Sequence, residues 1–162
     1  MTSHAIIITP YGKALIAMEG NFVVCLLFLT ADEQKMLSLF RSKFPDSKEL
    51  NSQQFDTTIH KIFNNTHIDF KMHGTDFQKS VWKELIKLDS VTSYQELAHK
   101  IQNSKAVRAV ANAVAKNLLH FIVPCHLIVR SNGSLGKYAG GLTLKQELTS
   151  TKFPPYAFHF CE

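Results

Sequence analysis

Cysteine is scarce in this chain of 162 residues, whose three cysteines, Cys25, Cys125 and Cys161, are widely spaced. An odd number of separated cysteines argues against a disulfide framework and fits a reducing compartment. Neither an internal repeat nor a low-complexity segment is visible. These absences exclude a disulfide-stapled scaffold and a repeat protein.

Long apolar runs are absent as well. No segment approaches the length of a membrane span, and residues 1–10 lack the charged start and long apolar stretch of a signal peptide. With 45% hydrophobic and 19% charged residues, the chain is expected to be a compact soluble protein of the cytoplasm, with no membrane partner. Its formal charge of +5 permits a polyanionic partner such as nucleic acid without requiring one.

The first half alternates between strand-like and helix-like segments. Residues 5–29 hold apolar runs rich in β-branched and aromatic residues, broken by two groups of turn residues, which predicts an antiparallel meander. Helical spacing of apolar residues predicts a helix over 32–44, and a second helix is expected over 53–63. Residues 64–73 are interpreted as a strand or a connection into a second unit.

The second half is expected to be helical. Thr75 can cap an amphipathic helix, and Ser93 with Glu96 forms the pattern of a capping box for a helix that runs to about Ile101. An alanine-rich helix is expected over 104–117, so two short helices joined by a tight turn suggest a helix-turn-helix.

The C-terminal region is expected to contain one more helix. It is predicted over LTLKQELTS (residues 142–150), and the tail over 153–162 is interpreted as an irregular cover.

Cys125 lies in the apolar run FIVPCHLIV and has two readings. A free cysteine commonly behaves as a small buried hydrophobe. Against that reading, Pro124 interrupts a regular strand and His126 adds a titratable group. In an extended segment the two neighbouring side chains point to opposite sides, so a water relay or a local bend is needed for His126 to activate the thiol.

Three further side chains are candidates for binding. Arg108 is the charged residue of AVRAVANAV, either solvated or in contact with DNA, since its small neighbours allow close approach to a duplex. Tyr94 is either a packed aromatic or part of a site. Tyr138 is a candidate wall for a flat ligand within a glycine-rich stretch that lacks the spacing of a phosphate loop.

Five motifs, taken in order, closely resemble the O6-alkylguanine-DNA alkyltransferases. The similarity covers roughly residues 74–148, while the N-terminal half resembles the family in outline, through its TPYGKALIAM hairpin. The motifs are FQKSVWKEL (77–85), TSYQELA (92–98), AVRAVANAVAKN (106–117), VPCH (123–126) and GSLGKYAGGL (133–142).

The resemblance implies a fold and a partner. An α/β (α+β) domain with a ribonuclease H-like sheet is expected over 1–72, followed over 73–162 by an all-α catalytic domain with a helix-turn-helix. The implied partner is double-stranded DNA containing O6-alkylguanine, bound through the minor groove by a monomer. The damaged nucleotide would be flipped out, because its reacting carbon is inaccessible inside the base stack.

The resemblance also implies residue roles. Cys125 takes the alkyl group and keeps it, His126 deprotonates the thiol through water, and Tyr94 assists departure of the guanine. Arg108 matches the arginine that fills the vacated space, and Asn117 an asparagine that braces the helix-turn-helix against the active site. Further expected DNA contacts are Ser93 and Lys105, and the expected pocket lining is Leu135, Gly136, Tyr138, Ala139 and Gly140.

Two positions depart from the family pattern. Leu127 stands where the family has an arginine, and an ungapped count from Cys125 places Lys152 where the family has the glutamate that orients the histidine. Glu147, or more remotely Glu162, is a candidate substitute for that glutamate. These departures keep open an alternative function, a protein that binds alkylated DNA without efficient transfer.

Two other readings are less well supported. A Cys-His hydrolase would normally bring its catalytic pair together from distant positions and orient it with a third group. His4 and Cys25 lack the paired spacing of a metal site. We therefore expect no metal and no cofactor.

Overall fold

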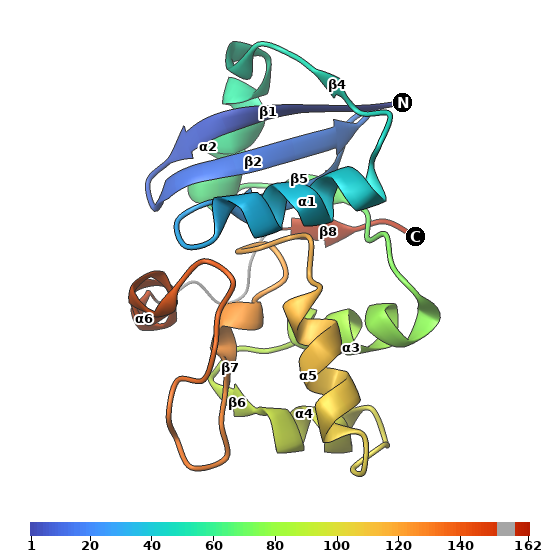
Figure 1. The fold of residues 1–162 in the computed structure, drawn as a ribbon, viewed down its shortest axis with the longest axis vertical. Coiled ribbons are helices and arrows are strands. Elements are labelled where there is room, and N and C mark those ends of the chain that lie inside the picture. The colour runs from blue at the N-terminus through green and yellow to red at the C-terminus, as the bar shows by residue number, and fades with distance from the viewer. Residues whose placement is uncertain (152–157) are drawn as a thin grey trace.

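The computed structural model describes residues 1–151 and 158–162, which form a mixed α/β fold. Figure 1 shows a sheet with its helices at one end of the molecule and a mainly helical part at the other. The sheet has six strands in the order β4-β1-β2-β3-β5-β8. Their bounds are β1 Thr2–Thr9, β2 Gly12–Glu19, β3 Phe22–Phe28, β4 Lys48–Glu49, β5 Ile68–Phe70 and β8 Phe158–Phe160.

The predicted meander is confirmed as β1, β2 and β3. Thr9 pairs with Gly12 and Glu19 with Phe22 across the two tight turns. Gly12 has φ +113°, a conformation that L side chains rarely adopt, so glycine suits this turn. The meander is extended by strands that pair in parallel, β4 on β1 and β5 on β3.

Both faces of the sheet are buried. Alternate residues of β3 belong to two separate clusters of apolar side chains, one with Leu26 and Phe28 and one with Leu27. Helix α1 (Glu33–Lys43), which Asp32 caps by accepting from Lys35 N–H, packs in the second cluster. Helix α2 (Asp56–Phe63) packs in the first, and the residues before it form a short 3-10 helix, η1 (Ser52–Phe55).

The second part contains four α-helices among the described residues: α3 Asp76–Ile86, α4 Tyr94–Lys100, α5 Val107–Ala115 and α6 Leu142–Ser150. Thr75 caps α3 in a full capping box with Gln78. Ser93 caps α4 by accepting from the Glu96 N–H, which is one half of the box predicted there. Helix α5 is shorter than predicted, because the chain remains in turns up to Ala106.

Two segments differ from the sequence predictions. The second part also contains a short parallel pair, β6 (Thr92–Ser93) with β7 (Ile128–Val129), so it is not entirely helical. The tail was expected to be irregular, but β8 pairs in parallel with β5. Residues 152–157, which include the first part of that tail and Lys152, lie outside the described residues.

A connection between the two parts runs along β3. Leu26 N–H donates to Leu118 O, and His120 N–H donates to Leu26 O, at 2.7 and 2.8 Å. This pairing fixes the segment that leads from α5 toward Cys125. Within residues 1–151 and 158–162, no helix is long and apolar enough to cross a membrane.

Candidate active site

A cavity of about 380 Å³ lies between the two parts of the molecule. This volume is within the range of small-molecule sites, roughly 300–1,000 Å³. Its walls come from the start of α1, the start of α4, the end of α5 and the segment 136–142. The side chains that decide its chemistry are Cys125, Tyr94, Tyr138 and His120.

Cys125 begins a 3-10 helix, η2 (Cys125–Leu127), rather than lying in an extended strand. Pro124 precedes it with ψ 63°, and its carbonyl accepts from Leu127 N–H at 3.1 Å. The chain is therefore not extended here, and the local bend that the sequence left open occurs at Cys125 itself. The residue is 6% exposed and still lines the cavity.

Asn117 holds the cysteine from the end of α5. Its Nδ2 lies 3.1 Å from Cys125 Sγ and donates to Val123 O at 3.0 Å, and its Oδ1 accepts from Leu119 N–H at 2.9 Å. This side chain is buried and does not line the cavity. The bracing role implied for Asn117 is consistent with these contacts, which join α5 to the loop that carries the thiol.

Lys145, in α6, is fully buried and was not singled out from the sequence. Its ammonium donates to the carbonyls of Ile128, Leu135 and Lys137. Burial lowers the pKa of Lys145, and charge on Cys125 counteracts that lowering. A cation is thus held next to the thiol by neutral acceptors, so its charge remains available to a thiolate.

His126 is buried beside this lysine. Its Nδ1 has no hydrogen-bond partner among the described residues. Burial, and then the charge of Lys145, lowers the pKa of His126 to about 4. The imidazole is therefore neutral near pH 7, as a proton acceptor must be.

Neither glutamate proposed from the sequence orients His126. Glu147 is exposed on α6, and Glu162 pairs with Lys83 at 3.4 Å with 81% of its side chain exposed. Lys152 is not among the described residues. The expectation that Glu147 or Glu162 substitutes for the family's glutamate is not supported by this geometry.

The thiol itself is not ionised at rest. Burial raises the pKa of Cys125 to about 11, while the Asn117 amide and the charge of Lys145 act in the opposite direction. The pKa of Tyr94 is raised by burial and then by charge on Cys125. The site thus holds a protonated thiol, a neutral imidazole and a protonated phenol.

The glycine-rich segment forms one wall of the cavity. Gly136, Tyr138 and Ala139 line it as expected from the sequence. Gly140 does not line it, but a Cβ there would lie 2.9 Å from the Tyr138 ring and 2.8 Å from Leu144, so glycine allows this close packing. Leu135 contributes its carbonyl to Lys145.

The expected DNA contacts lie at the start of α4, in the turn before α5 and on the exposed face of α5. Arg108 and Lys105 are exposed, and neither forms an ion pair among the described residues. Helix α5 contributes Val114 and Ala115 to the cavity, which places Arg108 about 10 Å along the helix from this wall. Ser93 precedes Tyr94 at the start of α4.

Two residues of the site were missed. His120 lines the cavity, and its Nδ1 accepts from Phe28 N–H at 3.0 Å. Lys145 lies between Leu144 and Leu148, which share the buried face of α6. A lysine inside an apolar helical stripe is the signal that could have identified it.

His4 and Cys25 do not approach each other. They lie on β1 and β3, with Ala17 of β2 between them in the register. Two strand spacings separate them, about 10 Å. The expectation of no metal at this pair stands as a prediction.

Comparison with known proteins shows what the chain resembles. Residues 76–151 match the family model for the DNA-binding domain of 6-O-methylguanine DNA methyltransferase. The methylated-DNA–protein-cysteine methyltransferase of Methanosarcina mazei is 35% identical, over 90% of this chain and 93% of that protein. Its counterpart from Haemophilus influenzae is 32% identical over 91% and 84%.

A longer relative and a solved structure extend the comparison. The bifunctional transcriptional activator/DNA repair enzyme Ada of Escherichia coli is 35% identical, and the match covers 85% of this chain but 41% of Ada. The crystal structure of Mycobacterium tuberculosis OGT in complex with DNA superposes with a TM-score of 0.73 at 26% identity, over 91% of this chain and 90% of that one. The chain belongs to the methylated-DNA–protein-cysteine methyltransferase family.

Proposed function

We propose that this protein repairs DNA by transferring an alkyl group, typically methyl, from O6 of guanine to Cys125 in a single irreversible turnover. The observation that carries the proposal is the environment of Cys125 Sγ. It faces a cavity, receives a hydrogen bond from Asn117 and lies in the field of a buried lysine. The names of the family's members, which are methylated-DNA–protein-cysteine methyltransferases, point to the same chemistry.

The transfer step uses Cys125, His126 and Tyr94. The Cys125 thiol gives its proton to His126 through a water molecule, and the thiolate attacks the alkyl carbon. The C–S bond forms as the bond from that carbon to guanine O6 breaks, and its electron pair stays on the guanine. The Tyr94 hydroxyl assists by donating a proton to the departing base. A thioether has no easy route back to a thiol, so each molecule reacts once.

Because the pKa of the resting Cys125 thiol is high, the thiol must be deprotonated in the complex with DNA. Because the thiol pKa is about 11, few molecules carry a thiolate before DNA binds. Lys145 and the Asn117 amide favour the charged form, and both are already in place. The chemistry therefore requires no metal and no organic cofactor.

Duplex DNA is the proposed partner, approached from the minor groove. We interpret α4 and α5 as a helix-turn-helix with α5 as the recognition helix. The outer face of α5 carries small residues with Arg108, which allows close approach to the duplex and occupation of the space left by the flipped nucleotide. We expect Lys105 and Ser93 to contact phosphates.

The finer fold and setting belong to the same proposal. The antiparallel meander with flanking helices is interpreted as a ribonuclease H-like domain over 1–72, and the catalytic domain as 73–162. We expect a monomer acting in the cytoplasm, with double-stranded DNA as its partner.

Intact-protein mass spectrometry after incubation with an O6-methylguanine duplex tests the transfer. One added methyl group per protein, mapped to Cys125 and absent in Cys125→Ser, is the expected result. An unchanged mass with retained duplex binding would instead support lesion recognition without transfer. That alternative is favoured by the raised thiol pKa and by His126 Nδ1, which has no hydrogen-bond partner in the part of the chain that the structure describes.

A further inference from the structure

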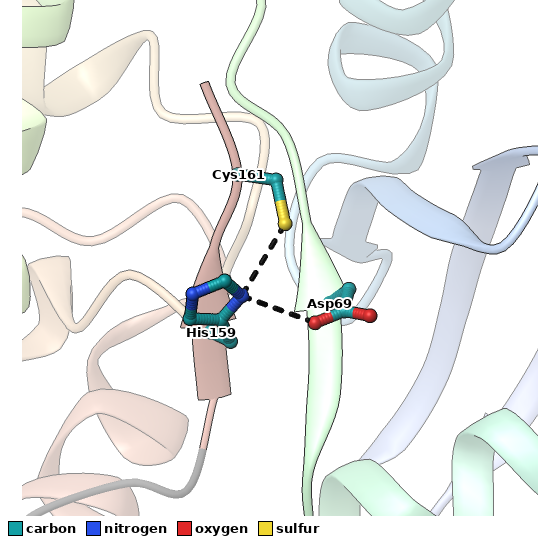
Figure 2. Close-up of side chains that lie close together, drawn as sticks. All are labelled: Asp69, His159 and Cys161. Atoms are coloured by element: carbon teal, nitrogen blue, oxygen red, sulfur yellow. Dashed lines mark hydrogen bonds and ion pairs between the residues drawn. The ribbon is translucent and has the colours of Figure 1, made fainter.

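Four side chains able to ligate a metal lie together where the C-terminal strand joins the sheet. His159 Nδ1 lies 3.2 Å from Asp69 Oδ1 and 3.4 Å from Cys161 Sγ. Figure 2 shows these three side chains turned toward one another between β5 and β8. Their donor atoms all lie within 4.8 Å of one another. None of the three lines the cavity that holds Cys125.

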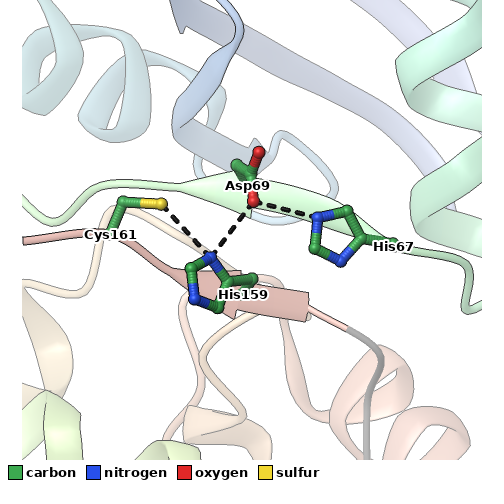
Figure 3. Close-up of polar contacts among 4 residues, drawn as sticks. All are labelled: His67, Asp69, His159 and Cys161. Carbon is green, nitrogen blue, oxygen red and sulfur yellow. Dashed lines mark hydrogen bonds and ion pairs between the residues drawn. The ribbon is translucent and has the colours of Figure 1, made fainter.

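A fourth donor comes from the residue before β5. His67 Nε2 lies 3.0 Å from the same Asp69 oxygen, as Figure 3 shows, and the His67 and His159 rings stack with centroids 6.0 Å apart. The four residues thus provide two imidazoles, one carboxylate and one thiol. This donor set suits Zn²⁺, whereas Mg²⁺ and Ca²⁺ prefer oxygen ligands alone.

The backbone creates this cluster through strand periodicity. Asp69 is opposite His159 in the parallel register of β5 and β8, and Cys161 N–H continues the ladder to Phe70 O. Residues two apart share a face, so His67 joins Asp69 and Cys161 joins His159 on one face. The intervening aromatics point to the other side, where the Phe70 and Phe160 rings lie 5.7 Å apart.

The distances agree with a shared ion. With bonds of about 2.3 Å to sulfur and about 2.0–2.2 Å to nitrogen and oxygen, neighbouring ligands of a tetrahedral zinc lie roughly 3.3–3.6 Å apart. The His159 Nδ1 separations from Asp69 Oδ1 and Cys161 Sγ, 3.2 and 3.4 Å, are close to these edges. Asp69, His159 and Cys161 form the group whose donor atoms all lie within 4.8 Å of one another, and His67 joins this group through Asp69, at 3.0 Å. Hydrogen bonds alone explain them less well, because His159 Nδ1 carries either one proton or one lone pair and faces two partners.

We propose that His67, Asp69, His159 and Cys161 bind one Zn²⁺ ion that fastens the C-terminal strand to the sheet. Binding deprotonates the Cys161 thiol and releases that proton to solvent. The imidazoles are largely exposed, at 68% for His67 and 62% for His159, so the ion can enter without opening the core. This structural site is separate from the transfer chemistry, and it revises the expectation that the chain binds no metal.

Cobalt substitution tests the site in the full-length protein. After chelator treatment, Co²⁺ should bind in a 1:1 ratio with a thiolate charge-transfer band and tetrahedral d–d bands, and Zn²⁺ should displace it. Cys161→Ser should remove the charge-transfer band and weaken Co²⁺ binding at least tenfold. Cys125→Ser and the exposed histidine variant His60→Ala should behave like the wild type. Loss of the band in Cys125→Ser, or its absence from the wild type, would overturn the proposal.

Thermal unfolding supplies a second readout. Zn²⁺ should raise the Tm of the chelator-treated wild type, because a ligand that binds only the folded state stabilises it. In Asp69→Asn, which keeps the shape of the side chain, the Zn²⁺-induced rise should largely disappear. An equal rise in wild type and Asp69→Asn would place the ion elsewhere and contradict the proposed ligands. This readout does not depend on alkyl transfer, so it stands apart from the test of the repair function.

Discussion

Lys145 is the residue whose burial most affects the proposed chemistry. A buried ammonium is costly unless it is hydrogen-bonded, and here three backbone carbonyls accept from it. Because those acceptors are neutral, the positive charge is not cancelled and acts on Cys125, whose thiol pKa it lowers. Burial, and then the same charge, lowers the pKa of His126, so the imidazole stays neutral.

Removing this charge should move the pH dependence of transfer. In Lys145→Met the pKa of the Cys125 thiol should rise further, so the alkylation rate near neutral pH should fall roughly tenfold for each pKa unit. The rate should then recover at higher pH, which single-turnover assays across a pH series can measure. The pH profile of Lys145→Arg, which retains a cation, should be shifted less. A profile in Lys145→Met that falls at all pH values without shifting would indicate a purely structural role.

Asn117 should affect stability as well as reactivity. In Asn117→Ala the buried Leu119 N–H loses its acceptor, Asn117 Oδ1, which costs about 1–3 kcal/mol, whereas the Val123 carbonyl still accepts from Cys125 N–H. Urea denaturation should show a free energy of unfolding lower by about 1–3 kcal/mol in Asn117→Ala than in the wild type. Asn112→Ala, an exposed change on the same helix, should leave the unfolding free energy within about 0.5 kcal/mol of the wild type. Similar stability of both variants would show that the Asn117 contacts contribute little.

At the scale of elements, α5 connects the surface proposed to bind DNA to the cavity. Arg108→Ala should slow repair of duplex substrate by tenfold or more, yet change the reaction with free O6-alkylguanine base less than twofold, because the free base needs no extrusion from a duplex. The two single-turnover rates provide the measurement. Lys61→Ala removes the same charge from an exposed position on α2 and should affect neither rate. Equal losses on both substrates in Arg108→Ala would indicate that the arginine supports the fold.

Elements formed by local patterns were predictable from the sequence. The meander, the caps Thr75 and Ser93, and the helix over 142–150 depend on turn chemistry and periodicity within a few residues. Strand β8 was not predictable in this way. Its three residues pair with β5, about ninety positions earlier in the chain, and a run of that length has no period of its own.

In the candidate site too, features carried by local motifs were predictable and those decided by tertiary packing were not. Cys125, Tyr94, Tyr138 and Asn117 were identified because they stand in motifs, and the structure brings them to one cavity or to the thiol. The bend at Cys125 remained one of two alternatives, because an apolar run with β-branched residues is also typical of a strand. Lys145 was missed because lysine is usually exposed, and only tertiary packing decides otherwise.

At the scale of the whole molecule, the two parts share a buried histidine at their junction. His120 follows the segment paired with β3, and its Nδ1 accepts from Phe28 N–H, so this ring is neutral in the folded protein. Burial, and then the charge of His126, lowers the pKa of His120 to about 3. Together with His126, whose pKa is lowered to about 4, the junction holds two histidines that resist protonation.

These two histidines should make the fold sensitive to mild acid. In the unfolded chain both titrate near pH 6.5, so between about pH 6.5 and the folded-state pKa values the unfolded state binds more protons. Their contribution to the free energy of unfolding is fully present above about pH 6.5. It decreases as pH falls, by about 1.4 kcal/mol per histidine for each pH unit well below 6.5. Urea denaturation between about pH 7.5 and 5 should show this decrease before most carboxylates titrate.

His120→Asn separates this effect from general acid denaturation. The asparagine Oδ1 can replace Nδ1 as the acceptor for Phe28 N–H, but the side chain does not titrate. The variant should therefore lose stability about half as steeply over the same pH range, since His126 still titrates. His99→Asn, at an exposed position on α4, should retain the full wild-type slope. A His120→Asn slope equal to that of the wild type would mean that the junction histidine is not what couples folding of the two parts to pH.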